Sequence, residues 1–186
     1  MPELITPATH LHHAWLAARD EWGRGTHQPG SGLRPTDDID TTTGFTRWVT
    51  RLHHEADETR PPAPGLVHAA YWWITEPGDT ILGAVSLRYT LTDFLLHAGG
   101  HIGYSVRPTA RGRGIARWAL TEVTTIADRR GINPVLVTCD DDNHASARVI
   151  EKCGGVLEDI RHTEIGHKRR YWITPARPAR IPHERS

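Results

Sequence analysis

The sequence predicts an α/β fold, an α+β mixed sheet flanked by helices. Segments with alternating apolar residues occur between segments whose apolar residues recur at helical spacing. Near the middle of the chain a strand-like stretch runs into a glycine-rich turn and then into an amphipathic helix. The chain has 186 residues, 38% of them hydrophobic, which suits one domain with its own core. We expect a single domain over residues 1–175 and a flexible, proline- and arginine-rich tail over residues 176–186.

The first part of the chain is expected to form a strand, two helices and a hairpin. Leu11 and Trp15 share one face of the first helix, and Thr43 is expected to cap the second. The loop of residues 23–35 holds four glycines and two prolines, and it is a candidate lid over a site. The expected bounds are residues 3–8 for the strand, 10–22 and 43–58 for the helices, and 67–75 and 80–90 for the hairpin.

The second part is expected to alternate strands with two further helices. A central strand begins at Ile102 and stops at Pro108, which has no N–H to donate to a sheet. The helix after the turn is expected to run to about Arg130. Another helix begins with Asn143 as its N-cap and ends before Gly154. The remaining bounds are residues 93–96 for a helical turn and 134–139, 156–161 and 168–174 for strands.

The turn after the central strand reads Arg111-Gly112-Arg113-Gly114-Ile115-Ala116. The first N–H groups of a helix have no intrahelical partner, and the helix dipole places partial positive charge there. With two glycines that admit a ligand to the backbone, the turn predicts a pyrophosphate cradle. An ordinary strand-to-helix turn that contains two glycines is the alternative. The turn lacks the lysine of a P-loop, and Arg117 stands where a dinucleotide fingerprint requires its third glycine.

Two motifs resemble those of the GNAT superfamily of N-acetyltransferases. The first is Arg-x-x-Gly-x-Ala at residues 111–116, preceded by Val106-Arg107-Pro108. The second begins at Asn143, has a serine three residues later, and closes with Glu-Lys-x-Gly. The order of elements also agrees, so the resemblance covers nearly the whole chain. It implies a central splayed sheet and acetyl-CoA as co-substrate.

The resemblance also implies which residues bind acetyl-CoA. The pantetheine arm would lie beside the central strand and pair with its backbone as an added strand does. The loop amides would hold the pyrophosphate; Arg111 would add a contact, and Arg113 would either do the same or be solvated. Asn143 would contact the arm besides capping its helix. The expected cofactor-binding residues are Ser105, Val106, Arg107, Arg111, Gly112, Arg113, Gly114, Ile115, Ala116, Asn143 and Ser146.

The sequence departs from the family at the general acid. Many members have a tyrosine seven residues after the asparagine, where this chain has Ile150, which cannot donate a proton. Tyr104 on the central strand and Cys139 on the next are candidate donors, and each also reads as a structural residue. His101 stands where many members have a glutamate that works through water, so it is the candidate base. A strand-end histidine without a catalytic role is the alternative. The expected catalytic residues are His101 and Tyr104.

Acidic residues near the expected cleft would suit a cationic amine, although most of them read better as solvated loop charge. They are Asp20, Glu21, Asp37, Asp38, Asp40, Asp140, Asp141 and Asp142. The histidine runs at residues 10–13 and 53–54 lack the partner residues of a zinc site. We therefore expect surface histidines there and no metal.

The composition bears on partners and location. The chain has 22 basic and 22 acidic residues, so nothing in its charge favours nucleic acid. No apolar run reaches the ~18 residues of a membrane span. The start of the chain lacks a signal-peptide pattern, and two cysteines make no disulfide framework. We expect a cytoplasmic protein with no membrane partner.

The resemblance predicts an N-acetyltransferase that moves an acetyl group from acetyl-CoA to the primary amine of a small molecule. The amine would attack directly within a ternary complex. Three alternatives stay open: a non-catalytic acyl-CoA-binding module or sensor, transfer of another acyl group, and transfer to a protein N-terminus. The expected partners are the amine and acetyl-CoA, and a homodimer stays open.

Overall fold

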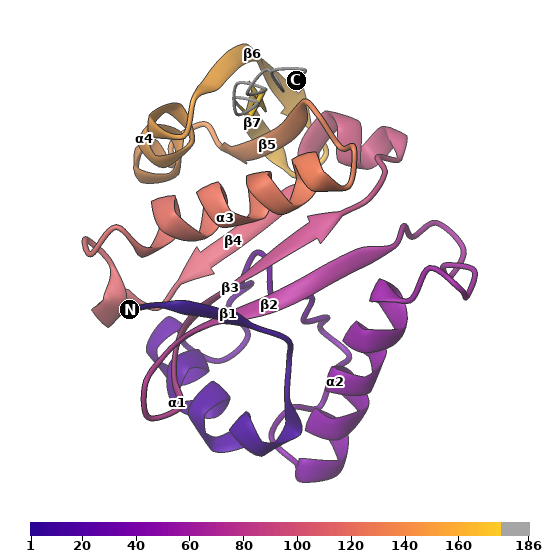
Figure 1. Cartoon of the computed structure of the whole chain (residues 1–186), viewed down its shortest axis with the longest axis vertical. Helices are drawn as coiled ribbons and strands as arrows, with labels where there is room; N and C mark the ends of the chain where they lie inside the picture. The colour runs from indigo at the N-terminus through magenta and orange to yellow at the C-terminus, as the bar shows by residue number, and fades with distance from the viewer. Residues whose placement is uncertain (176–186) are drawn as a thin grey trace, which may run out of the picture.

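The computed structural model describes residues 1–175, so the expected tail of residues 176–186 lies outside the described residues. In the described part, seven strands form one sheet in the order β1-β2-β3-β4-β5-β7-β6 (Figure 1). The strands are β1 (Glu3–Ile5), β2 (Ala69–Glu76), β3 (Thr80–Arg88), β4 (Ile102–Val106), β5 (Val135–Asp140), β6 (Gly155–Thr163) and β7 (Gly166–Ile173). The helices are α1 (His12–Trp22), α2 (Thr42–Ala56), α3 (Ile115–Arg129) and α4 (His144–Lys152), with short helical turns at Thr9–Leu11, Leu95–Gly99 and Pro108–Ala110.

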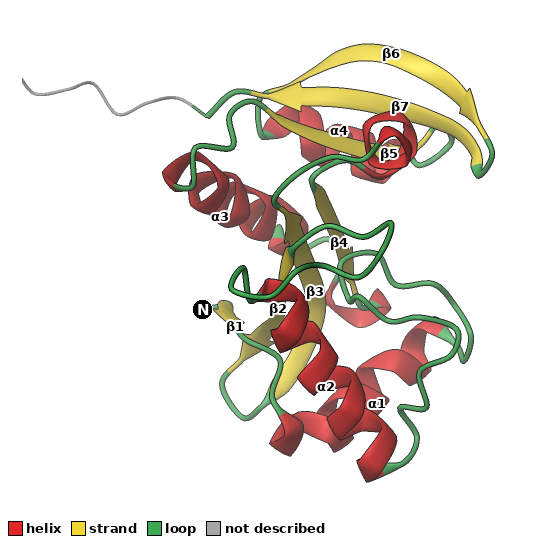
Figure 2. Ribbon diagram, turned by 90° about the vertical axis from the view of Figure 1, so that its right-hand side faces the viewer, coloured by secondary structure: helices red, strands yellow, loops and turns green. Residues whose placement is uncertain are grey.

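The helices cover both faces of the sheet. In Figure 2, α3 lies on one side of β3 and β4, whereas α1 and α2 lie on the other side. Leu120 and Val123 of α3 are buried on the first face. On the second face Trp15, Trp48 and Trp73 form an aromatic cluster with ring centroids 4.8, 4.9 and 5.6 Å apart. Each amphipathic helix thus buries its apolar stripe against the sheet, which gives the domain a core on both sides.

The order of elements is as predicted, and the differences lie at element ends. Thr41, not Thr43, caps α2: its Oγ1 accepts a hydrogen bond from the N–H of Gly44 at 3.1 Å. Thr41 has the extended backbone of an N-cap, whereas Thr43 already lies inside the helix. Within residues 1–175, no helix is long and apolar enough to cross a membrane.

The sheet opens between β4 and β5. This pair is parallel, and it is joined at one register position, Ile102 with Val137. By contrast, β3 and β4 pair from Leu87 opposite Ile102 to Gly83 opposite Val106. The strands β4 and β5 therefore diverge after Ile102, as the splayed sheet predicts. Figure 2 shows the β5–β7–β6 part of the sheet above the β1–β4 part.

Candidate functional site

Alternate residues of β4 offer their main-chain groups to different neighbours. The N–H of Arg107 donates to the carbonyl of Leu82 at 2.8 Å. The N–H of Arg88 donates to the carbonyl of His101, also at 2.8 Å. From residue 103 to 107 the odd-numbered residues therefore bond to β3 and the even-numbered residues face β5, whereas His101 bonds to β3 through its carbonyl and to β5 through its main-chain N–H.

Tyr104 and Val106 consequently direct their main-chain groups toward the divergence. The orientation fits the predicted contact at Val106, whose carbonyl also accepts a hydrogen bond from Arg111 Nε at 3.2 Å. The main chain of Tyr104, which the sequence analysis did not single out, has the same orientation. Main-chain contacts at Ser105 and Arg107 are not supported by this pattern, because Ser105 pairs with Ala84 of β3 and the N–H of Arg107 donates to Leu82. Coenzyme binding at these two residues stays a prediction.

Tyr104 and Ser146 bring their hydroxyl groups together beside the divergence. The Oη of Tyr104 is 2.7 Å from Ser146 Oγ in the first turn of α4. It also donates to the carbonyl of Ser146 at 3.4 Å. Burial raises the pKa of Tyr104 well above its ordinary value, so the phenol keeps its proton at neutral pH. Ile150 is fully buried in the apolar core and has no polar atom to offer in its side chain.

Asn143 caps α4 as predicted. Its Oδ1 accepts a hydrogen bond from the N–H of Ser146 at 3.0 Å. This bond satisfies one of the free N–H groups in the first turn of the helix. The contact between its side chain and the pantetheine arm stays a prediction.

Asn143→Ala is expected to lower the free energy of unfolding by about 1 kcal/mol, because a helix cap is lost. It should also raise the KM for acetyl-CoA, because the same side chain is predicted to contact the substrate. Thermal unfolding and steady-state kinetics measure the two effects separately. Thr41→Ala, which removes the cap of α2, is the matched control with a similar loss of stability and an unchanged KM. An unchanged KM in Asn143→Ala would show that Asn143 caps the helix and does not contact acetyl-CoA.

The turn between β4 and α3 has the geometry of an anion cradle. Gly112 and Gly114 have φ values of 76° and 79°, a region that favours glycine. A Cβ built on either glycine meets no atom within 4 Å, so the space in front of both is open. The N–H of Trp118 bonds to the carbonyl of Gly114 at 3.0 Å, so the N–H groups of Ile115 and Ala116 precede the intrahelical ladder. These residues fit a pyrophosphate group.

The side chains of Arg107 and Arg113 are engaged within the protein. Arg107 donates to the carbonyl of Ile81 at 3.0 Å and to the carboxylate of Glu21 in α1. This pairing holds the pKa of Glu21 at about 2. Arg113 pairs with Glu76 at the end of β2. A phosphate group would have to share the guanidinium of Arg113 with this carboxylate.

His101 joins β4 to β5 just before the strands diverge. Its ring atom Nδ1 accepts a hydrogen bond from the N–H of Leu136 at 2.9 Å. The main-chain N–H of His101 donates to the carbonyl of Leu136 at 2.7 Å. Burial, aided by the charge of Arg88, lowers the pKa of His101 to about 4. The lone pair of Nδ1 is occupied and the ring is a weak base at neutral pH. This geometry supports a structural role for His101. The prediction that His101 acts as the general base gains no support from it.

The environment of His101 leads to an expected pH dependence of stability. Its pKa of about 4 in the fold lies below the ordinary value of 6.5, so the unfolded chain binds the proton more tightly. The contribution of His101 to stability is present above pH 6.5 and is lost as the pH falls toward 4. Melting temperatures across this window should fall further for the wild type than for His101→Gln, which does not titrate there. Parallel curves for the two proteins would contradict the buried, neutral ring.

Basic side chains neutralise most of the acidic residues that were candidates for holding a cationic amine. The pairs are Asp20 and Asp40 with Arg19, Asp37 with Arg51, Glu21 with Arg107, Asp140 with Lys168, and Asp141 with Arg169. Asp38 accepts a hydrogen bond from Thr41 Oγ1 at 2.8 Å instead. These contacts favour structural ion pairs over a site for a cation.

Two histidines of these runs, His12 and His53, make contacts that serve the fold. No group of three metal-binding side chains occurs within residues 1–175. His12 Nε2 is 2.8 Å from the carbonyl of Ile39, and His53 Nε2 is 2.7 Å from the carbonyl of Pro7. His12 is buried, so the expectation of a surface histidine is wrong at that position. Its ring anchors the segment before α2.

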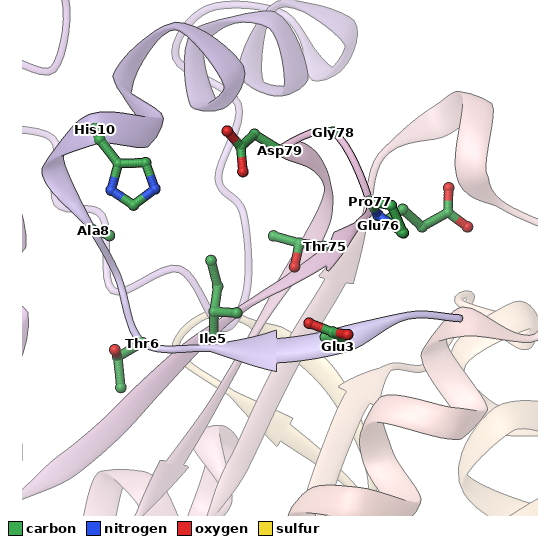
Figure 3. Close-up of a pocket in the computed structure, with 10 residues that line it drawn as sticks. All are labelled: Glu3, Ile5, Thr6, Ala8, His10, Thr75, Glu76, Pro77, Gly78 and Asp79. Carbon is green, nitrogen blue, oxygen red and sulfur yellow. The ribbon is translucent and has the colours of Figure 1, made fainter.

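A cavity of about 530 Å³ lies outside the site (Figure 3). It lies between β1 and the turn that joins β2 to β3, and Ile5, His10, Thr75 and Asp79 are among its lining residues. None of the residues that line it belongs to β4, β5, α3 or α4. The cavity is therefore separate from the divergence of β4 and β5.

Known proteins were compared with the chain by sequence and by structure. The sequence matches the acetyltransferase (GNAT) domain family over residues 5–156. No curated protein matches the chain. A similar solved structure is the microcin C7 self-immunity acetyltransferase MccE in complex with acetyl-CoA and AMP, at 16% identity and a TM-score of 0.68, covering 94% of this chain and 92% of that one.

Two other similar structures carry different activities in their names. RimL, the ribosomal L7/L12 alpha-N-protein acetyltransferase in complex with coenzyme A, has 18% identity and a TM-score of 0.69, with 93% of each chain covered. A chimera of spermidine N-acetyltransferase SpeG from Vibrio cholerae and hSSAT has 12% identity and a TM-score of 0.62, covering 93% of this chain and 95% of that one. At these identities the structures share the fold, whereas the family match extends over most of the chain. The chain therefore belongs to the acetyltransferase (GNAT) family and is an acetyl-CoA-dependent acetyltransferase.

Proposed function

We propose that the protein transfers the acetyl group of acetyl-CoA to a primary amine, which attacks directly within a ternary complex. The observation that carries the proposal is the divergence of β4 and β5, with the glycine-rich turn at the end of β4. The N–H groups of residues 112–116 would hold the pyrophosphate. The main-chain groups of Tyr104 and Val106 would pair with the extended arm. When bound, acetyl-CoA supplies the activated acyl group.

The amine is expected to reach the divergence from the face that α1 and α2 cover. The elements that would hold the coenzyme, α4 and the start of α3, lie on the opposite face. Direct transfer requires the coenzyme and the amine to meet at the divergence of β4 and β5. If the coenzyme approaches from the face of α3 and α4, the face of α1 and α2 is available to the amine. On that face β4 and the residue after it carry Gly103, Ser105 and Arg107, because side chains alternate along a strand. The side chain of Arg107 follows this pattern, since it reaches Glu21 in α1.

Tyr104 is proposed as the hydrogen-bond donor to the departing sulfur. Its raised pKa makes the phenol a poor acid, but a neutral donor beside developing negative charge still stabilises it. Ser146, 2.7 Å away and half-buried at the start of α4, would connect the phenol to solvent protons. Burial also raises the pKa of Cys139 to about 11, so its thiol stays protonated. These groups stand in for the tyrosine that Ile150 replaces.

The attacking amine must be neutral, although free alkylamines are protonated below a pKa of ~10. Glu21 is too weak a base for this step, since Arg107 holds its pKa at about 2. We therefore propose that the reaction depends on the fraction of free amine, so that turnover rises with pH.

A panel of primary amines with acetyl-CoA tests the proposed reaction. Release of the coenzyme thiol and the mass of the acetylated product are measured for alkylamines, amino amides and diamines. Turnover of at least one amine, with intersecting double-reciprocal plots, is the expected result for a ternary complex. Coenzyme binding without turnover of any amine would contradict the proposal and favour the non-catalytic binding module.

The acceptor is proposed to be a small molecule, with a protein N-terminus as the second candidate. The similar structures are named for both kinds of acceptor, a ribosomal protein for RimL and spermidine for SpeG. The ion pairs around α1 and α2 weigh against a polyamine, because their carboxylates are already neutralised.

A further inference from the structure

An unpartnered carboxamide lies under the loop between α1 and α2. Gln28 is 2% exposed although it belongs to a connecting loop, so its side chain is turned into the protein. Within residues 1–175, neither its Oε1 nor its Nε2 has a hydrogen-bond partner. A buried amide without partners destabilises a fold, so such groups are rare and call for an explanation.

The loop follows β4 between two fixed contacts. At one end the last turn of α1 receives the side chain of Arg107. At the other end Gly30 lies so close to the strand that a Cβ on it would be 2.5 Å from the carbonyl oxygen of Gly103. Gln28 comes two residues before Gly30, in the stretch of loop between these two contacts. The segment expected to be a lid is thus packed on the sheet here.

The same stretch of β4 carries two further buried polar atoms without partners, Ser105 Oγ and Arg107 Nε. Both side chains project from the face that α1 covers, since they are two residues apart on one strand. Three side chains therefore offer unpaired donors and acceptors on the face assigned to the amine. Convergent polar groups in an otherwise apolar surrounding are typical of a ligand site.

We propose that Gln28 determines acceptor specificity by pairing its carboxamide with an amide group next to the acceptor's amino nitrogen. The assignment rests on the proposed amine acetylation. A carboxamide presents an acceptor oxygen and N–H donors side by side, so it matches a second amide with two hydrogen bonds. An amine without such a group leaves Gln28 unpaired and binds less well. The ligand class is therefore an amino amide.

The charges of the site select against a polycation. A second ammonium group would find no free carboxylate beside Arg107 on this face. The carboxylate of Glu21 is already bound to Arg107 and to Thr109, whose N–H donates to it at 3.1 Å. An uncharged amide needs no carboxylate partner and uses the free hydrogen-bonding groups.

Gln28→Met tests the assignment, because methionine is also unbranched and reaches a similar length without hydrogen-bonding N–H or oxygen atoms. The kcat/KM values for glycinamide, ethylamine and 1,4-diaminobutane are measured at saturating acetyl-CoA. Each value is compared with that of the wild type for the same amine, so that differences in amine basicity cancel. We expect at least a tenfold loss for glycinamide, through KM, and a change within about twofold for ethylamine.

The melting temperature without ligand is the second readout. It should stay equal or rise in Gln28→Met, because a buried unpaired amide is removed. A lower melting temperature, or an unchanged ratio of glycinamide to ethylamine, would overturn the assignment. If the wild type acetylates none of the amines, both the proposed reaction and the role of Gln28 are wrong. If the wild type is active and Gln28→Met acetylates every amine equally well, only the role of Gln28 is wrong.

Ser31→Ala is the matched control within the same loop. Ser31 Oγ donates to the carbonyl of Gln28 at 2.7 Å and accepts from the N–H of Leu33 at 3.1 Å. Its loss should lower the melting temperature but keep the ratio of glycinamide to ethylamine. A change of that ratio in Ser31→Ala as large as in Gln28→Met would assign the effect to loop shape and overturn the role of the carboxamide.

Discussion

Gly114→Glu is expected to weaken coenzyme A binding at least a hundredfold while the protein stays folded. A Cβ at Gly114 meets no atom within 4 Å, so the new side chain extends into the space assigned to the pyrophosphate. Its carboxylate also places negative charge at the start of α3, where the free N–H groups attract anions. Both effects oppose a pyrophosphate and neither crowds the core. Isothermal titration calorimetry with coenzyme A measures the loss.

Gly131→Glu is the matched control for this experiment. Gly131 follows α3 at its other end, has a φ of 76°, and its Cβ would also meet no atom within 4 Å. The strain of a side chain at positive φ, about 1–2 kcal/mol, is thus similar in both variants. Gly131→Glu should lose a similar amount of stability and keep its affinity. Undiminished affinity in folded Gly114→Glu would refute the assignment of the loop.

Tyr104→Phe is expected to lower kcat by about 10²-fold, the usual effect of removing one donor to developing charge. The substitution deletes the hydroxyl that lies 2.7 Å from Ser146 Oγ and keeps the ring that packs against the core. The KM for acetyl-CoA should change little, because the predicted coenzyme contacts of Tyr104 use its main chain. Ser146→Ala should have a smaller effect, since it removes the link to solvent and leaves the phenol.

Tyr89→Phe provides the control for Tyr104→Phe. Tyr89 lies just after β3, and its ring stacks under the guanidinium of Arg130 at 3.8 Å. Loss of this hydroxyl should leave kcat unchanged. A Tyr104→Phe enzyme with the kcat of the wild type would show that the phenol only packs, and the stabilising donor would have to come from Cys139 or from water.

Features with local causes were predictable from the sequence. The helix after the glycine-rich turn follows from residues that are adjacent in the chain, and so does its open N-terminus at Gly114. The cap at Asn143 follows from a side chain that reaches the N–H of Ser146, three residues away. The cap of α2 shows the limit of this reasoning. Thr41 and Thr43 both suit an N-cap, and the place where the backbone turns helical decided for Thr41.

The roles of charged and titratable residues were not predictable, because their partners lie far away in the sequence. Arg107 meets Glu21 across 86 positions, and His101 meets the main chain of Leu136 across 35 positions. Because of these contacts, Glu21 is part of an ion pair and is not free to bind a substrate amine. His101, the candidate base, links β4 to β5 instead. No local pattern distinguishes the two outcomes, since the same side chain suits either one.

The sequence by itself determined the family, the order of the elements and the position of the glycine-rich turn. All of these depend on residue spacings within one strand or one helix, which the chain encodes locally. The tertiary structure alone decided that the divergence of β4 and β5 begins after Ile102, that Tyr104 meets Ser146 across 42 positions, and that Gln28 is buried. These features depend on which faces of separate elements are brought together. Which faces meet depends on the free energy of the whole fold, so it cannot be read from any single segment of the sequence.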